Sequence, residues 1–333
     1  MQVNIQEQID ARSSGWSRLA ESLPTEPCPK QRRMKGMTYK KLYAHIRLGH
    51  GIGHGTQYKP WLTLRRKNPS PNSNQVVSFM PPLQRTAHYF SRGEYHTALL
   101  LLWLGVLDLR EQFPIWPVAH PNPLNGAPGV LATNLKWSRG LIAIAREANI
   151  EHGHEVGSTQ PYVASLDLVA TVPRRNGIGL SIFSSKPIKE SSSQVKWRTL
   201  ERLELERRYA AEMEAQYFVS SSALIPMHIA GQLEWWLDCS TLHFAPELLQ
   251  LASQFASVIS SHSDLALSEA VECAANATFI SIDNGWLLFR HCAWKQLIDI
   301  DPSSRILTSH PLRGGGIELR NKLRLRLFGE TWP

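Results

Sequence analysis

Two carboxylates and one lysine in this sequence form a set that could act on a phosphodiester bond. Asp167 and Lys186 lie in the stretch SLDLVATVPRRNGIGLSIFSSKP at 165–187, and Glu94 lies in GEYHTALLLLWLG at 93–105. Carboxylate oxygens are the ligands that Mg²⁺ and Mn²⁺ prefer. Such an ion lowers the pKa of its bound water and stabilises negative charge on a phosphate, and a lysine can support that charge. The three residues would therefore suit metal-dependent phosphodiester cleavage if the fold brings them together.

The stretch at 165–187 predicts a β-hairpin. Apolar residues alternate on both sides of Asn176-Gly177, and this dipeptide is typical of a type I′ turn because both turn positions need a positive φ. With a two-residue turn there, Asp167 lies directly opposite Lys186, with their Cβ atoms about 5 Å apart. Pro173 could lengthen the turn and move the register. An ordinary cross-strand ion pair, worth a few tenths of a kcal/mol, explains the same geometry, so the hairpin alone leaves both interpretations open.

Glu94 also has two interpretations. Ser91-x-x-Glu94 before an apolar run predicts a capping box, in which the glutamate closes the N-terminus of a buried helix. A glutamate at that position can also pack against the edge of a sheet where a metal ion sits. In the second case Glu94 completes the set with Asp167 and Lys186.

Composition indicates a globular protein of two or three domains. The chain has 333 residues, of which 43% are hydrophobic, enough for real cores. Its four cysteines lie far apart without a CxxC motif, so we expect neither a zinc site nor a disulfide framework. This use of cysteine indicates a protein of the reducing cytoplasm. No apolar stretch approaches the roughly 18 residues of a membrane helix, and the N-terminus does not resemble a signal peptide. We therefore expect no membrane partner.

The positive charge is concentrated in one segment. The net charge is +8, yet residues 27–93 contain 13 Lys and Arg and no Asp or Glu. A local field of this kind attracts polyanions, and Tyr39, Tyr43, Tyr58 and Trp61 among the cations favour DNA. A solvated basic tail or an anchor to an anionic membrane is the alternative.

The order of predicted elements indicates three regions. Residues 1–80 read as a basic arm with a helix near 37–48, a glycine-rich loop at 49–55 and a turn-rich linker at 68–74. Residues 81–225 read as a mixed α/β layer with one sheet, in the order helix, strand, hairpin, helix, strand. The elements that we expect there are a helix from residue 91, an extended segment at 108–117, a short helix at 141–148, the hairpin, a helix at 199–216 and a strand at 217–220.

Residues 226–333 predict a different design. Helices at 247–260 and 265–275, followed by a hairpin that turns on Asp283-Asn284-Gly285, give the order of a winged helix. A generic α+β appendage fits the same pattern. The second helix carries acids and no Lys or Arg, so it would be a poor reader of DNA. The tail RNKLRLRLFGE at 320–330 alternates basic and apolar residues, as a half-buried strand or a docking peptide would.

Several blocks of the sequence resemble the TnsA endonucleases of heteromeric cut-and-paste transposons. They are RLGHGIGHGTQYKPWLTL, GEYHTALLLLWLGVLDLREQFPIWP, SLDLVATV, SIFSSKP and TLERLELERRY, which follow in order from about residue 45 to 222. The resemblance implies a restriction-enzyme-like PD-(D/E)xK nuclease domain followed by a winged-helix domain. It further implies a Mg²⁺-dependent DNA endonuclease, for which Mn²⁺ is a possible substitute, that cuts the 5′ ends of a transposon. Its implied partners are a TnsB-like DDE transposase and a TnsC-like AAA+ ATPase.

The resemblance carries the family's catalytic glutamate, aspartate and lysine onto Glu94, Asp167 and Lys186. One position departs from the pattern, because the residue two before the lysine is Ser184 in place of Glu or Gln. A further metal contact must then come from the Ser184 hydroxyl, from the Ser185 carbonyl or from water. The departure motivates an alternative hypothesis, a cleavage-impaired subunit that binds DNA and holds the transposition complex together.

Overall fold

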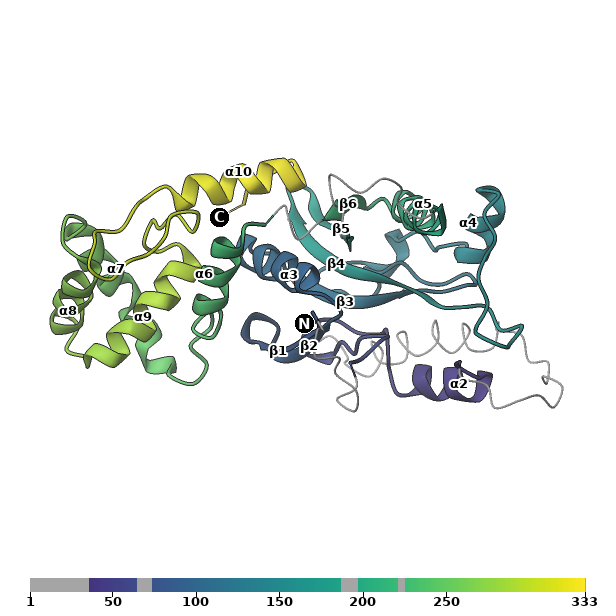
Figure 1. Cartoon of the computed structure of the whole chain (residues 1–333), viewed down its shortest axis with the longest axis horizontal. Helices are drawn as coiled ribbons and strands as arrows, with labels where there is room; N and C mark the ends of the chain where they lie inside the picture. Colours follow the sequence, from purple (N-terminus) through teal and green to yellow (C-terminus); the bar gives the residue numbers. More distant parts are fainter. Residues whose placement is uncertain (1–35, 65–73, 187–196, 221–224, 333) are drawn as a thin grey trace.

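A computed structural model describes residues 36–64, 74–186, 197–220 and 225–332 of the chain. The molecule is elongated, with a mixed α/β half and a helical half at opposite ends of its long axis (Figure 1). The α/β half confirms the mixed layer expected from the order of elements. Most of the predicted linker at 68–74 and the first 35 residues of the predicted arm lie outside the described residues.

A four-stranded sheet forms the centre of the α/β half. Its order is β3-β4-β5-β6, with the first three strands antiparallel and β6 parallel to β5. The parallel pair needs a crossover connection, and helix α5 lies between the two strands in the chain. The bounds are β3 Asp108–Ile115, β4 Ala164–Arg174, β5 Gly177–Ser185, α5 Trp197–Glu212 and β6 Gln216–Ser220, each close to its predicted segment.

Both faces of the sheet are covered by helices. Successive residues of β4 point to opposite faces, so Leu168 packs into the core that contains α3 (Arg92–Leu104), and Val169 packs into the core that contains α4 (Leu141–Glu147) and α5. Helix α3 begins where predicted, with the Ser91 hydroxyl accepting a hydrogen bond from Glu94 N. Figure 1 shows α3 beside β3 and β4 of the sheet.

The hairpin is confirmed, but its predicted register is wrong by two residues. Arg174 pairs with Gly177, so the turn contains Arg175 and Asn176, and Asp167 lies across from Ser184 in the continuation of this register. Tertiary contacts explain the shift: the Arg174 side chain crosses Gly179, where a Cβ would lie 2.8 Å from it, and donates to the Phe328 carbonyl. An even shift keeps every side chain on its original face.

The N-terminal arm packs against the α/β half. Helix α2 (Tyr39–Arg47) confirms the helix predicted near 37–48, and it buries Leu42 and Ile46 in a small core with Trp61 and Trp116. The glycine loop contains no α-helix, and its four glycines all have positive φ. A Cβ at Gly51 would lie 2.4 Å from the Pro114 side chain, so close packing requires glycine there. A two-stranded ribbon that the sequence did not predict follows, formed by β1 Val76–Met80 and β2 Arg85–Tyr89.

The C-terminal half is helical, and the predicted wing is wrong. Residues 278–289 form no hairpin, and no strand occurs within residues 225–332. The Ser281 hydroxyl caps α9 by accepting from Asn284 N, and Gly285 packs against Ala275 and Val271 of α8. The strand predicted for the tail is wrong as well, because the tail forms a helix, and the docking-peptide alternative stays a prediction. The helices of this half are α6 Met227–Leu237, α7 Ala252–Ser261, α8 Leu267–Ala277, α9 Ile282–Lys295 and α10 Gly316–Phe328, with a 3₁₀ turn at Pro246–Leu251. The α/β half contains 3₁₀ turns at Gly55–Gln57, Pro81–Leu83 and Ala132–Asn134.

The two halves share one hydrophobic core. Residues of α3, such as Leu99 and Trp103, belong to the same buried cluster as Trp236 of α6 and Phe289 of α9. The predicted domain boundary between residues 225 and 226 therefore stays a prediction. None of the helices in the described part of the chain is both long enough and apolar enough to cross a membrane.

Candidate active site

Asp167 and Lys186 meet at the end of the β4–β5 hairpin. Lys186 Nζ donates to Asp167 Oδ2 at 3.0 Å, and the backbone N–H of Ser185 donates to the same oxygen at 2.8 Å. The predicted pairing was directly across the hairpin. In the observed register Lys186 is a diagonal neighbour of Asp167, and its long side chain spans the extra distance between the two backbones.

Glu94 lies at the start of α3 and is 5% exposed. Its carboxylate accepts hydrogen bonds from Phe90 N at 2.9 Å and from the Ser91 hydroxyl at 3.1 Å, so the helix-capping interpretation is correct. Burial raises the pKa of the Glu94 carboxyl to about 7, and the negative charge of Asp167 adds to this. Those two hydrogen bonds and the charge of Lys186 act in the opposite direction. Glu94 is therefore both a cap and a carboxylate that interacts with Asp167.

Gln112 is a member of the site that the sequence did not reveal. It is buried in β3 with a φ of +48°, which interrupts the pairing with β4 at the position across from Asp167. Its amide donates to Glu94 Oε2 at 3.2 Å, and its carbonyl oxygen accepts from the Ser165 hydroxyl at 3.0 Å. The strand reads DLREQFPI and contains three other polar residues, so no signal in the sequence singles out Gln112.

Ser184 and Glu206 form a buried network behind the hairpin. The Ser184 side chain is fully buried and its hydroxyl donates to Glu206 Oε2, while Tyr217 donates to Ser184 Oγ at 3.1 Å. Arg202 Nε donates to the other Glu206 oxygen at 2.8 Å, and Arg202 Nη2 lies 4.0 Å from Asp167 Oδ1. Helix α5 thus places a carboxylate against the position where the resemblance leads us to expect an acidic or amide side chain.

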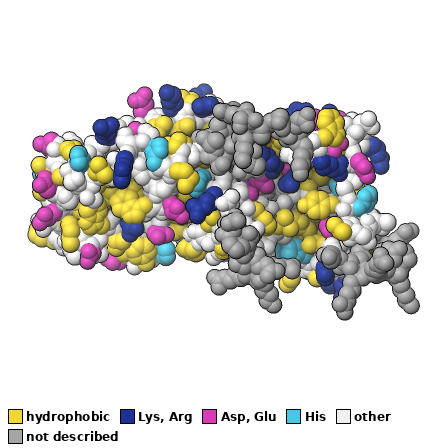
Figure 2. Space-filling model, in the orientation of Figure 1, with side chains coloured by type: hydrophobic (Ala, Val, Ile, Leu, Met, Phe, Trp, Pro, Cys, Tyr) yellow, Lys and Arg dark blue, Asp and Glu magenta, His cyan; other side chains and the backbone are white. Residues whose placement is uncertain are grey.

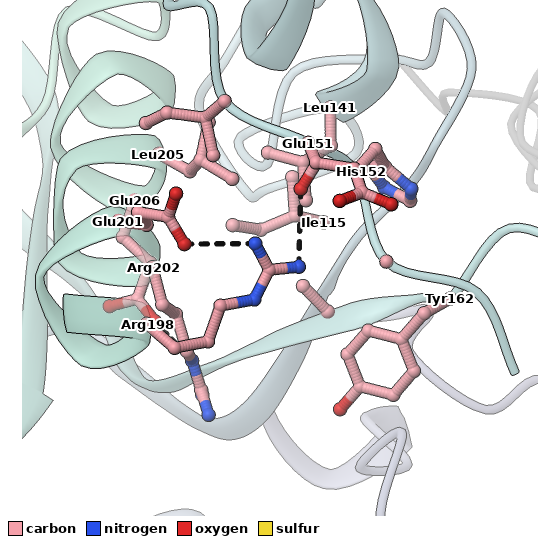
Figure 3. Close-up of a pocket in the computed structure, with 13 residues that line it drawn as sticks. Ile115, Leu141, Glu151, His152, Tyr162, Arg198, Glu201, Arg202, Leu205 and Glu206 are labelled. Carbon is pink, nitrogen blue, oxygen red and sulfur yellow. Dashed lines mark hydrogen bonds and ion pairs between the residues drawn. The ribbon is translucent and has the colours of Figure 1, made fainter. Parts of the chain in front are cut away.

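A cavity of about 150 Å³ lies next to this network between α5 and the segment at 150–153. Its walls include Ile115, Leu141 and Leu205, and Arg202 and Glu206 line it as well. Arg198 donates to Glu201 at 2.9 Å and to the Glu151 carbonyl at 3.2 Å (Figure 3). The cavity is mainly apolar and both of its arginines are paired with glutamates, so we assign no chemistry to it.

The residues around Asp167 and Glu94 fit a hard divalent cation. The side-chain oxygens are those such ions prefer, and Asp167 Oδ1 accepts no hydrogen bond from any described residue. The raised pKa of Glu94 reflects burial and repulsion between two carboxylates that a cation would neutralise. Within the described ranges there is no group of three or more His, Cys, Asp or Glu side chains suited to a metal. Backbone oxygens and water would therefore have to supply the other ligands.

Comparison with known proteins places the chain among transposition proteins. No family model matches the sequence. The transposon Tn7 transposition protein TnsA of Escherichia coli is 30% identical to it over 227 residues, which cover 66% of this chain and 70% of that protein. The chain belongs to the TnsA family, which confirms the resemblance seen in its sequence blocks.

Proposed function

We propose that this chain is a metal-dependent DNA endonuclease subunit of a heteromeric transposase, and that it cuts the 5′ ends of a transposon during cut-and-paste transposition. The contact of Lys186 Nζ with Asp167 Oδ2 at 3.0 Å, beside the buried carboxylate of Glu94, is the main support. Membership of the TnsA family supports the proposal independently, because the relative is a transposition protein.

In this proposal, Asp167 and Glu94 hold Mg²⁺, or Mn²⁺ in its place. A cation bound there would lower the pKa of a water molecule and neutralise charge on the scissile phosphate. The N–H of Ser185 fixes the orientation of Asp167, and its carbonyl oxygen is the candidate for a further ligand. Lys186 supports the negative charge that develops on the phosphate. The Ser184 hydroxyl is bonded to Glu206, so we assign it to holding that carboxylate in place.

We further propose that the sheet with α3 and α5 is a PD-(D/E)xK core. It would extend over residues 81–225, with 1–80 as a basic arm of the nuclease and 226–333 as a C-terminal helical domain that shares a core with it. The position of Asp167 on β4, a central strand of the sheet, supports this assignment, as does the contact of Gln112 on β3 with Glu94 at the start of α3.

The proposed substrate is double-stranded DNA of the transposon ends. Within the basic segment 27–93, α2 exposes Lys40, Lys41 and Arg47 while its apolar side is buried, as expected for a helix that faces phosphates. The proposed protein partners are a TnsB-like DDE transposase and a TnsC-like AAA+ ATPase. Free thiols at Cys239, Cys273 and Cys292 are compatible with a reducing cytoplasm.

A cleavage-impaired assembly subunit is the second candidate, and Ser184 is the observation that favours it. Strand-specific nicking of transposon-end DNA, with the purified partner transposase and Mg²⁺ or Mn²⁺, separates the two candidates. The endonuclease predicts a new 5′-end cut that appears only when this chain is present. Formation of a stable complex with DNA and partner, without that cut in either metal, supports the assembly subunit.

A further inference from the structure

Three nitrogen donors converge at the junction between α3 and α10. They are Arg320 Nη2, Arg324 Nη2 and Trp332 Nε1, and they surround Gly105, the residue that ends α3 with a φ of +84°. A Cβ built on Gly105 would lie 3.3 Å from the Arg320 nitrogen, 3.2 Å from the Arg324 nitrogen and 3.3 Å from the indole nitrogen. The three nitrogens therefore lie close to one another beside Gly105.

Several of the N–H groups at this junction have no acceptor among the described residues. Trp332 Nε1 and Arg320 Nε are buried and have no hydrogen-bond partner in the part of the chain that is described. Arg324 is 3% exposed, and its Nε and Nη1 donate to the carbonyls of Leu104 and Trp332. Its Nη2 makes no hydrogen bond to a described residue and could donate to a ligand. Arg320 Nη1 donates to the Lys295 carbonyl at 3.4 Å, so the buried nitrogens without a partner at this junction are two, Arg320 Nε and Trp332 Nε1. A buried polar group without a partner is costly, so a ligand would explain both of them.

The charge of the junction is also uncompensated. Arg320, Arg324 and Lys295 form no ion pair with any described residue. Burial and the neighbouring charge of Arg324 lower the pKa of the Arg320 guanidinium to about 10, and burial together with Arg320 lowers the pKa of Lys295. Neighbouring cations without a carboxylate repel one another, and a bound anion would remove this repulsion.

We propose that this junction binds a phosphate of the DNA backbone, through Arg320, Arg324 and the indole N–H of Trp332. This inference rests on the proposed function, which makes DNA the substrate. A polyanion fits better than a single carboxylate, because α10 also exposes Arg326. Figure 2 shows Lys and Arg side chains along the edge of the molecule where α10 lies in Figure 1. Planar guanidinium groups match the geometry of phosphate oxygens. The C-terminal half would then hold DNA beside the nuclease half.

The test is Arg320→Gln in the full chain, with Lys322→Gln as the matched control. Both variants lose one charge from α10, but residues 320 and 322 point to opposite sides of the helix. Binding of a short fluorescent DNA duplex is measured over a range of salt concentrations, in EDTA so that no cutting occurs. Arg320→Gln should weaken binding severalfold and make the log-log salt slope shallower by about 0.9, the value for one lost phosphate contact. Lys322→Gln should change the slope by much less.

A second variant keeps the proposal testable if Arg320→Gln lowers stability. Trp332→Phe retains the ring under Arg324 and removes only the N–H donor, so it should weaken duplex binding while the melting temperature stays unchanged. Equal effects of Arg320→Gln and Lys322→Gln would overturn the proposal in favour of diffuse attraction. Unchanged duplex binding by Arg320→Gln, with weaker binding of a polyglutamate peptide, would assign the junction to an acidic protein and also overturn it. Because binding is measured without metal, these outcomes do not depend on whether the chain cuts DNA.

Discussion

At the scale of single residues, the candidate site consists of two carboxylates that repel each other. Glu94 has a pKa of about 7 because it is buried and because Asp167 is nearby. The types of Glu94, Asp167 and Lys186 could be predicted from the sequence, since each belongs to a motif. Gln112 and Glu206 could not, because their roles depend on a positive φ in β3 and on the side of α5 that faces the hairpin.

A divalent cation should stabilise the folded chain through these carboxylates. A ligand that binds only the folded state stabilises it by RT ln(1 + [L]/Kd), so Mg²⁺ or Mn²⁺ should raise the melting temperature of the wild type. Mn²⁺ should have the larger effect, because it binds more tightly where a carboxylate ligand is missing. Calorimetric melting in each metal checks this. Asp167→Asn is the control, and an equal rise in that variant would place the cation elsewhere.

The Ser184–Glu206 contact makes a second prediction at this scale. Ser184→Glu would place two carboxylates together in a buried position, so it should destabilise the chain by several kcal/mol. The exchange Ser184→Glu with Glu206→Ser moves one carboxylate from α5 to β5 and should recover part of that loss. Urea unfolding of the two single variants and the double variant measures the coupling between the positions. Additive effects would show that the two side chains act independently.

At the scale of elements, the α/β half followed its sequence pattern closely. In the helical half, the helices predicted at 247–260 and 265–275 form close to their expected bounds, but the predicted hairpin does not form. Alternation in the hairpin and the apolar run of α3 are local signals, and both elements form where predicted. In α9 the Asp-Asn-Gly triplet resembles a turn, yet Asn284 and Gly285 lie in the first turn of the helix because Ser281 caps it and α8 packs against the glycine. The packing of α8 against Gly285 is a tertiary contact that the turn-like triplet does not reveal, whereas the Ser281 cap is a local signal for a helix start.

The cap of α9 can be tested directly. Ser281→Ala removes the acceptor for Asn284 N and should lower the free energy of unfolding by about 1 kcal/mol. Ser257→Ala, at an exposed position inside α7, is the matched control and should be neutral or slightly stabilising, because alanine favours helices more than serine does. Urea denaturation of both variants gives the comparison. A neutral Ser281→Ala would argue against a helix that begins at residue 282.

At the scale of the whole molecule, stability should depend on pH through a buried histidine far from the candidate site. Burial lowers the pKa of His120 to about 4 from its ordinary value of 6.5. Between these values the unfolded chain binds a proton that the folded chain does not, so stability falls as the pH drops from 6.5 towards 4. The loss from this residue is on the order of 3 kcal/mol.

His120→Gln should remove this part of the pH dependence. Glutamine can still donate to the Val118 carbonyl and accept from the Tyr209 hydroxyl, so the packing is retained. Between pH 7 and pH 4.5, the unfolding free energy of the wild type should fall relative to that of the variant. A constant difference across this range would show that His120 is not protonated on unfolding.

The most direct test of the central claim is 5′-end nicking of transposon DNA by the wild type and by Asp167→Asn, in the presence of the partner transposase. The asparagine keeps an oxygen for the Ser185 N–H and removes the charge that would hold the cation. We predict that the variant folds with a melting temperature within a few degrees of the wild type, binds DNA and partner equally well, and makes no 5′-end cut. A stable Asp167→Asn variant that cuts at the wild-type rate would contradict the account and leave the Asp167–Lys186 contact as an ordinary ion pair.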